Sequence, residues 1–100
     1  MTLSYEQKIA IFEDEQYGME KYSIKPNKVN FKYKGKVIVR EMREGSPVAY
    51  VWGKEINQIT EEYKVDDRYW IHVHDFSEQE IRDLLVKVLA LRDKIGMSNK

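Results

Sequence analysis

The chain has 100 residues, of which 42% are hydrophobic and 34% are charged, and its formal net charge is zero. This length and composition predict one folded, soluble domain spanning residues 1–100, and they exclude a disordered chain. The absence of cysteine from the sequence excludes disulfides, thiolate nucleophiles and cysteine-ligated metal sites. No signal-like start and no apolar run of membrane-spanning length is present, so we expect a cytoplasmic protein that does not contact membranes.

A short helix is the first predicted element, within residues 4–16. Ser4 and Gln7 can form a capping box, in which each side chain accepts from a free backbone N–H. Apolar residues then recur at helical spacing: Tyr5, Ile9 and Phe12. The stretch KIAIF taken alone also fits a strand, so helix and strand both remain open for this segment.

A basic block follows, in which residues 21–43 contain eight Lys or Arg residues against one acid, Glu41. The flanking segments, residues 1–20 and 44–83, are acidic overall. Blocks of this kind can steer a charged partner, or they can neutralise one another across neighbouring strands of a sheet. The basic block is therefore the part of the chain that would serve a nucleic acid partner.

Three consecutive strands are predicted between residues 29 and 52, separated by short turns at Lys34-Gly35 and at EGSP. They are VNFKY (29–33), KVIVREM (36–42) and VAYVW (48–52). The first alternates apolar and polar residues with a period of two, which is typical of a half-buried antiparallel strand.

Residues 57–76 predict a further hairpin that turns at Asp66-Asp67. Its first arm, residues 57–65, also has apolar residues at helical spacing, but its β-branched and aromatic residues favour a strand. A two-residue turn would pair Tyr63 with Trp70, Glu61 with His72 and Ile59 with His74. Because this register mixes polar and apolar residues on the opposite face, either the loop is longer or the first arm is an edge strand. Such an edge strand could pair with a second copy to form a homodimer.

The last element is a predicted helix from Glu78 to Ile95. Ser77 and Glu80 form a capping box before it, and Gly96 suits the position that ends a helix. Its apolar face consists of Ile81, Leu84, Leu85, Val88, Leu89, Leu91 and Ile95. An amphipathic helix needs a surface to cover. The predicted fold class is therefore α+β: an antiparallel sheet of about four to five strands, with this helix and a short N-terminal helix packed on one face.

Both histidines lie within RYWIHVHDFSEQE, residues 68–80. In a strand, Trp70, His72 and His74 would point to the same face. Two such imidazoles could ligate a metal, but the sequence spacing does not indicate which residues would be the further ligands. A metal-binding protein that uses His72 and His74 is therefore kept as an alternative, and no metal site is assigned. The sequence has no nucleophile elbow, no glycine-rich phosphate loop and no H-E-x-x-H motif. We therefore expect no enzyme, no catalytic residues and no cofactor.

If the C-terminal helix covers Ile71 and Val73, the reverse face of the sheet presents aromatic and imidazole groups to solvent. The predicted partner-binding residues are Trp70, His72, His74, Tyr50 and Trp52. Large aromatic side chains outside a core usually contact a partner, although tryptophan is highly buried on average and these rings could equally form the core. The prediction is a non-enzymatic binding protein of the accessory, immunity or inhibitor type that acts through protein–protein contact or self-association.

A nucleic-acid-binding module is the other alternative, because aromatic platforms beside lysines can stack single-stranded bases. The cations available for it are Lys32, Lys34, Lys36 and Arg40. A sequence pI near 6.7 and the lack of a glycine-bracketed aromatic motif argue against this function.

Overall fold

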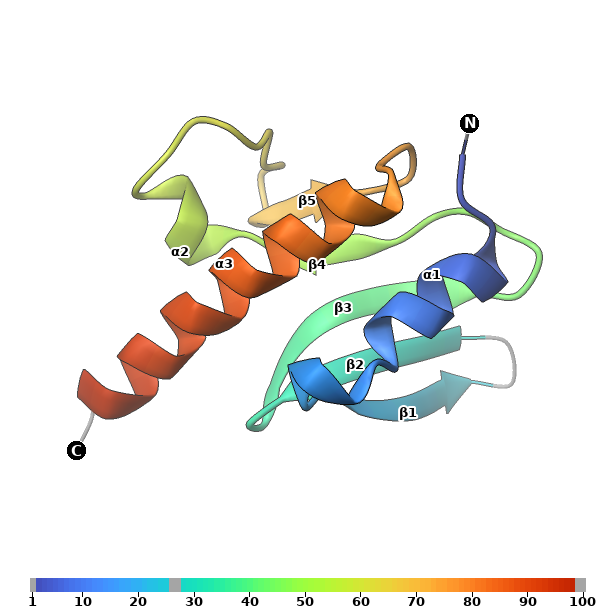
Figure 1. Cartoon of the computed structure of the whole chain (residues 1–100), viewed down its shortest axis with the longest axis horizontal. Coiled ribbons are helices and arrows are strands. Elements are labelled where there is room, and N and C mark those ends of the chain that lie inside the picture. Colours follow the sequence, from blue (N-terminus) through green and yellow to red (C-terminus); the bar gives the residue numbers. More distant parts are fainter. Residues whose placement is uncertain (1, 26–27, 99–100) are drawn as a thin grey trace.

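The computed structural model describes residues 2–25 and 28–98. In chain order its elements are α1 (Tyr5–Phe12), the 3-10 turn η1 (Glu15–Tyr17), β1 (Glu20–Lys25), β2 (Lys28–Tyr33), β3 (Lys36–Arg43), β4 (Tyr50–Trp52), α2 (Lys54–Asn57), β5 (Trp70–His72) and α3 (Glu78–Ser98). The strands form one five-stranded antiparallel sheet in the order β1-β2-β3-β4-β5 (Figure 1). The predicted α+β class is therefore confirmed.

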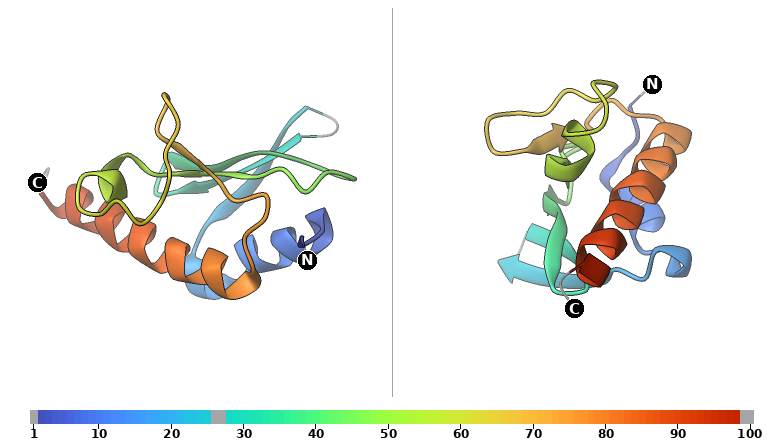
Figure 2. Two further views of the ribbon diagram at one scale, coloured as in Figure 1. Left: turned by 90° about the horizontal axis from the view of Figure 1, so that it is seen from above. Right: turned by 90° about the vertical axis from the view of Figure 1, so that its left-hand side faces the viewer.

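Both long helices cover one face of this sheet, and we call the opposite side the outer face (Figures 1 and 2). Phe12 of α1 packs on Phe31 of β2, with ring centroids 5.6 Å apart. Ile71 and Val73 are buried in the same core as the apolar stripe of α3, which is Ile81, Leu84, Leu85, Val88 and Leu89. Ile71 and Val73 therefore face the helix-covered side of the sheet, and this core determines which residues are left for the outer face.

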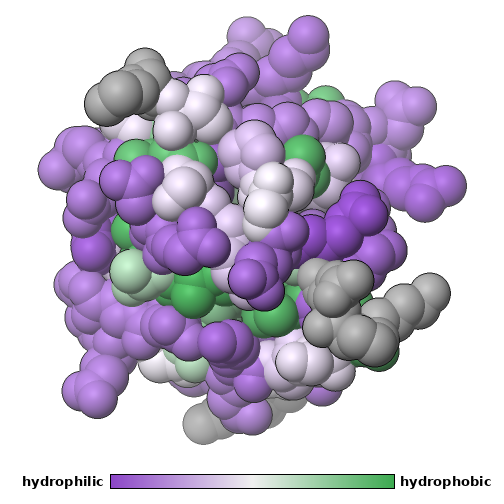
Figure 3. Space-filling model, turned by 90° about the vertical axis from the view of Figure 1, so that its right-hand side faces the viewer, coloured by the Kyte–Doolittle hydropathy of each residue, from purple (hydrophilic) through white to green (hydrophobic). Residues whose placement is uncertain are grey.

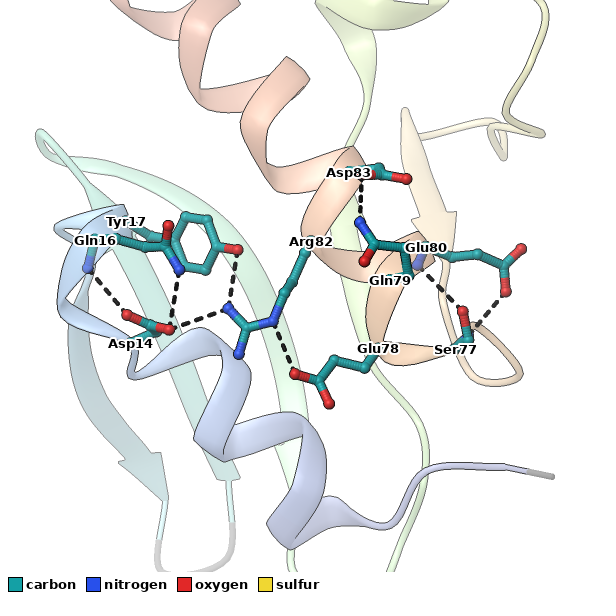
Figure 4. Close-up of polar contacts among 9 residues, drawn as sticks. All are labelled: Asp14, Gln16, Tyr17, Ser77, Glu78, Gln79, Glu80, Arg82 and Asp83. Atoms are coloured by element: carbon teal, nitrogen blue, oxygen red, sulfur yellow. Dashed lines mark hydrogen bonds and ion pairs between the residues drawn. The ribbon is translucent and has the colours of Figure 1, made fainter.

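Local hydrogen bonds explain why the helices begin where the sequence predicted. The N–H of Gln7 donates to the Ser4 hydroxyl and the Gln7 side chain accepts from the Ser4 N–H, so α1 is a helix and not a strand. Ser77 and Glu80 make the same pair of bonds before α3 (Figure 4). Gly96 does not end α3, which continues to Ser98. A single glycine costs a helix only about 1 kcal/mol, which the rest of a long helix tolerates.

The predicted hairpin over residues 57–76 is wrong. Residues 54–57 form α2, and the chain then runs irregularly until an isolated bridge pairs Val65 with Ile71. The side chain of Asp66 closes this longer loop, because it accepts the N–H groups of Arg68 and Trp70 at 2.9 Å each. The two-residue turn and its register are therefore absent, and so is the edge strand proposed to pair with a second copy.

The fifth strand is β1, which the sequence analysis did not predict. Its residues Glu20–Lys25 mix charged, polar and apolar types, and Ile24 is about half exposed. The strand forms because β2 supplies backbone partners, with Tyr22 opposite Asn30. It is an edge strand, and polar composition is usual at a sheet edge.

A buried lysine joins three segments at the N-terminal end of α1. The side chain of Lys8 is fully buried, and its Nζ donates to the carbonyl oxygens of Leu3 at 3.0 Å, Pro47 at 2.7 Å and His74 at 2.8 Å. Burial lowers the pKa of this ammonium, while nearby Asp75 acts in the opposite direction. At this end of the molecule the surface is largely hydrophilic, with hydrophobic residues showing as patches between hydrophilic ones (Figure 3).

Candidate protein-binding face

The pairing of β4 with β5 brings four of the predicted partner-binding residues together. Tyr50 lies opposite His72 and Trp52 lies opposite Trp70. Their ring centroids are 4.8 Å and 5.2 Å apart, with the rings edge to face. The fifth residue, His74, contacts both Tyr50 and His72 with centroids 5.3 Å apart. All five side chains thus form one connected set on the outer face.

Exposure differs among these residues. His72 is exposed, and Tyr50, Trp52 and His74 are half-buried. Trp70 retains only 7% of its accessible surface, so the prediction that it faces solvent is wrong. It is buried because Arg40 of β3 places its guanidinium carbon 4.6 Å from the Trp70 ring centroid while the Trp52 ring packs beside it. Sequence reasoning missed this because Arg40 and Trp70 lie on strands far apart in the chain.

Cations from the basic block cover the rings of the outer face. Besides contacting Trp70, Arg40 lies 5.6 Å from the Tyr50 ring, and Lys36 holds its Nζ 3.7 Å above Trp52. Lys32 points to the outer face because its neighbour Phe31 points into the core, and its Nζ lies 4.4 Å from the Tyr22 ring. These distances are those of cation–π contacts.

The α2 end of the face adds a pair that sequence reasoning missed. Tyr69 contacts Trp52 with ring centroids 6.1 Å apart, and Lys54 lies 5.4 Å from the Tyr69 ring. Sequence reasoning missed the Tyr69–Lys54 pair because the hairpin register that it predicted for this segment is wrong. Lys34, one of the cations predicted to lie beside the aromatic rings, instead forms an ion pair with Asp93 of α3 at 2.7 Å.

No carboxylate pairs with the cations that cover these rings. Within residues 2–25 and 28–98, Lys32, Lys36, Arg40 and Lys54 have no acidic oxygen within 4.0 Å. Other cations are paired, as Figure 4 shows for Arg82, which bonds Asp14 at 3.0 Å and Glu78 at 2.9 Å. These four cations therefore form no direct ion pair among the described residues, although Glu55, which accepts from the Trp52 indole at 2.9 Å, lies near Lys36.

Two of these cations also occupy partly desolvated positions. The Nε atom of Arg40 is buried and lacks a hydrogen-bond acceptor among the described residues. Burial lowers the pKa of Lys36, the neighbouring Arg92 acts in the same direction, and Glu55 acts against both. Both groups would gain from a negative charge brought to the face.

An Asp–His contact borders the aromatic set. His72 Nε2 lies 3.0 Å from Asp66 Oδ2, and these residues line an open pocket of about 280 Å³ with Lys64 and Val65. Hydrogen bonds from the Trp70 N–H and from His72 lower the pKa of Asp66 to about 2. The carboxylate is therefore ionised at neutral pH.

His74 is held differently from its neighbour. Its Nδ1 accepts the N–H of Ala49 at 3.2 Å, and burial, followed by the nearby His72, lowers its pKa. Across the part of the chain that the structure describes, no group of three or more His, Asp or Glu residues is arranged to hold a metal ion. The histidine pair thus has no third ligand for the metal site considered from sequence.

Fold and face together define a small α+β protein whose sheet has one helix-covered side and one side of stacked aromatic and cationic side chains. Comparison with models of known protein families, with curated proteins and with solved structures finds no match to the chain. Among the helices described, none is long and apolar enough to cross a membrane.

Proposed function

We propose that the protein is a non-enzymatic binding protein that holds a protein partner against the outer face of its sheet. The observation that supports this function is the connected set of Trp52, Trp70, Tyr50 and Arg40 on the side that no helix covers. Trp, Tyr and Arg are the residue types that dominate the binding energy of protein interfaces. Rings held in fixed orientation by their neighbours also lose little conformational entropy on binding.

Accessory, immunity and inhibitor proteins act by binding to the surface of another protein, and we group this protein with them. The cytoplasm is the compartment that we propose, consistent with a sequence that has no cysteine. A second copy of the chain is the other protein that could occupy the face.

The geometry favours a protein over a single-stranded nucleic acid. Base stacking requires an aromatic ring with an open face. Here Lys36 lies over Trp52, Arg40 lies over Trp70, and the ring pairs are arranged edge to face. The zero net charge of the chain also gives little long-range attraction for a polyanion.

Affinity capture from the native cell tests this function. Trp52→Ala and Tyr50→Ala remove rings of the outer face, and Val86→Ala is the matched control because Val86 is 60% exposed on α3, on the helix-covered side. We expect wild type and the control to retain the same proteins, and both ring variants to lose them. Circular dichroism verifies that each variant is folded.

Two outcomes would contradict the proposal. Capture that does not change in the ring variants would show that the bound proteins use another surface. A homodimer in light scattering that Trp52→Ala dissociates would replace the foreign partner with self-association.

A further inference from the structure

We infer that the segment bound to the outer face is acidic and that its carboxylates pair with Arg40 and Lys36. This inference rests on the proposed function and adds the chemistry of the partner. Acidic and basic residues are equal in number, at 17 each, but they are distributed unevenly along the chain.

Several acidic groups of the protein pair with cations away from the outer-face rings. Lys21 bonds Glu13 at 2.8 Å and Lys87 bonds Glu62 at 3.0 Å. Two acids border the face: Asp66 lies 3.0 Å from His72, and Glu55 accepts from the Trp52 indole at 2.9 Å. The cations over the rings have aromatic neighbours instead. A ring quadrupole attracts a cation without neutralising its charge. Arg40 and Lys36 have no ion-pair partner among the described residues.

Arg40 is the centre of this arrangement. Its guanidinium packs on the Tyr50 and Trp70 rings, and its buried Nε–H has no acceptor among the described residues. A buried donor without an acceptor is unfavourable, and few are left in native proteins. A carboxylate on the face would pair with the terminal nitrogens of the guanidinium, because Nε itself is inaccessible.

Spacing along β3 limits which acidic segments fit. Arg40 and Lys36 lie on the same strand, with an irregular register between them where β3 pairs with β2. Their separation along the strand is on the order of 10–13 Å, the rise of three to four strand residues. An extended partner would therefore carry acids three or four residues apart.

Fluorescence anisotropy with defined probes tests the inference. The probe is a short labelled peptide with Glu at every fourth position and Ser between, and its control has Gln in place of Glu. A labelled oligothymidylate of equal charge represents nucleic acid. We expect the Glu peptide to bind, the Gln peptide not to bind, and the oligonucleotide to bind more weakly than the Glu peptide.

Variants then locate the contact. Arg40→Gln and Lys36→Gln should each weaken binding of the Glu peptide by about 10-fold or more. Lys87→Gln is the matched control, since it removes one positive charge from an exposed ion pair on α3 and should change affinity by less than about 2-fold. If Arg40→Gln fails to fold, the affinity of Lys36→Gln for the Glu peptide still tests the inference. Arg40→Lys keeps the positive charge but lacks the planar guanidinium, so it should lose less affinity than Arg40→Gln.

Several results would overturn the inference: no binding of the Glu peptide, equal losses in Lys36→Gln and Lys87→Gln, or tighter binding of the oligonucleotide. These are distinguishable from failure of the proposed function. If the Glu peptide does not bind while Trp52→Ala still abolishes capture of the native partner, only the acidic character is wrong. If Trp52→Ala leaves capture unchanged, the proposed function itself is wrong.

Discussion

Replacing Lys8 with methionine should destabilise the fold strongly, although Lys8 lies outside the candidate face. Methionine keeps the length of the apolar stem and removes the ammonium, which donates to the carbonyls of Leu3, Pro47 and His74. These carbonyls belong to the N-terminal segment, the β3–β4 connection and the turn after β5. The single ammonium of Lys8 therefore joins three separate segments of the chain.

The magnitude follows from those three bonds. Each buried acceptor that loses its donor costs about 1–3 kcal/mol, so the sum is about 3–9 kcal/mol. The variant also avoids burying an ammonium, and the lowered pKa of Lys8 shows that this burial is unfavourable. We therefore expect the lower end of the range, about 3 kcal/mol, which is a large part of the ~5–15 kcal/mol that stabilises a typical domain.

Urea unfolding monitored by circular dichroism measures this loss as a lower midpoint at constant slope. Lys21→Met is the matched control, because it removes an exposed lysine paired with Glu13 and should cost less than about 1 kcal/mol. A Lys8→Met variant within about 1 kcal/mol of wild type would refute the reasoning, since water or a shifted carbonyl would then replace the ammonium at little cost.

Three further predictions concern the outer face. The folded protein lowers the pKa of Asp66 to about 2, from its ordinary value of 3.8. The ionised carboxylate therefore stabilises the fold above pH 3.8, and this stabilisation is lost as the pH falls toward 2. In Asp66→Asn, the stability should depend less on pH within this window. In an NMR titration His74 should show a pKa below 6.5, because burial disfavours its charged form. The folded protein should therefore lose stability as the pH falls through 6.5. A pKa above 6.5 would contradict the buried position of His74. Acrylamide should quench fluorescence in Trp70→Phe, where Trp52 remains, more than in Trp52→Phe, where the buried Trp70 remains; equal quenching would contradict the packing of Arg40 on Trp70.

The parts of the fold predicted from sequence are those determined by nearby residues. Ser77 and Glu80 mark the start of α3 because the cap is a reciprocal bond across three residues. Lys34 and Gly35 mark the β2–β3 turn, and both adopt positive φ, at 50° and 85°. Two consecutive residues of this kind form the tight turn that suits a hairpin, and glycine adopts it without steric cost.

The parts that were missed depend on residues distant in the chain. The loop before β5 is set by the Asp66 carboxylate bonding backbone N–H groups ahead of it, which composition does not reveal. The burial of Trp70 requires a guanidinium from β3. Strand β1 exists because β2 offers its edge, and its own sequence of mixed polarity does not favour a strand.

Residues of the outer face differ in how much stability they contribute, and this decides which variants can test binding. Cation–π contacts at accessible sites contribute about 0.5–1 kcal/mol each, so removing Lys36 from Trp52 should leave the fold intact. Trp70 is different: it is buried, and truncation of a buried tryptophan costs about 3–5 kcal/mol, so loss of binding in Trp70→Ala would report unfolding as readily as a lost contact. A binding loss in Lys36→Gln without a change in the unfolding midpoint is the result that separates the two.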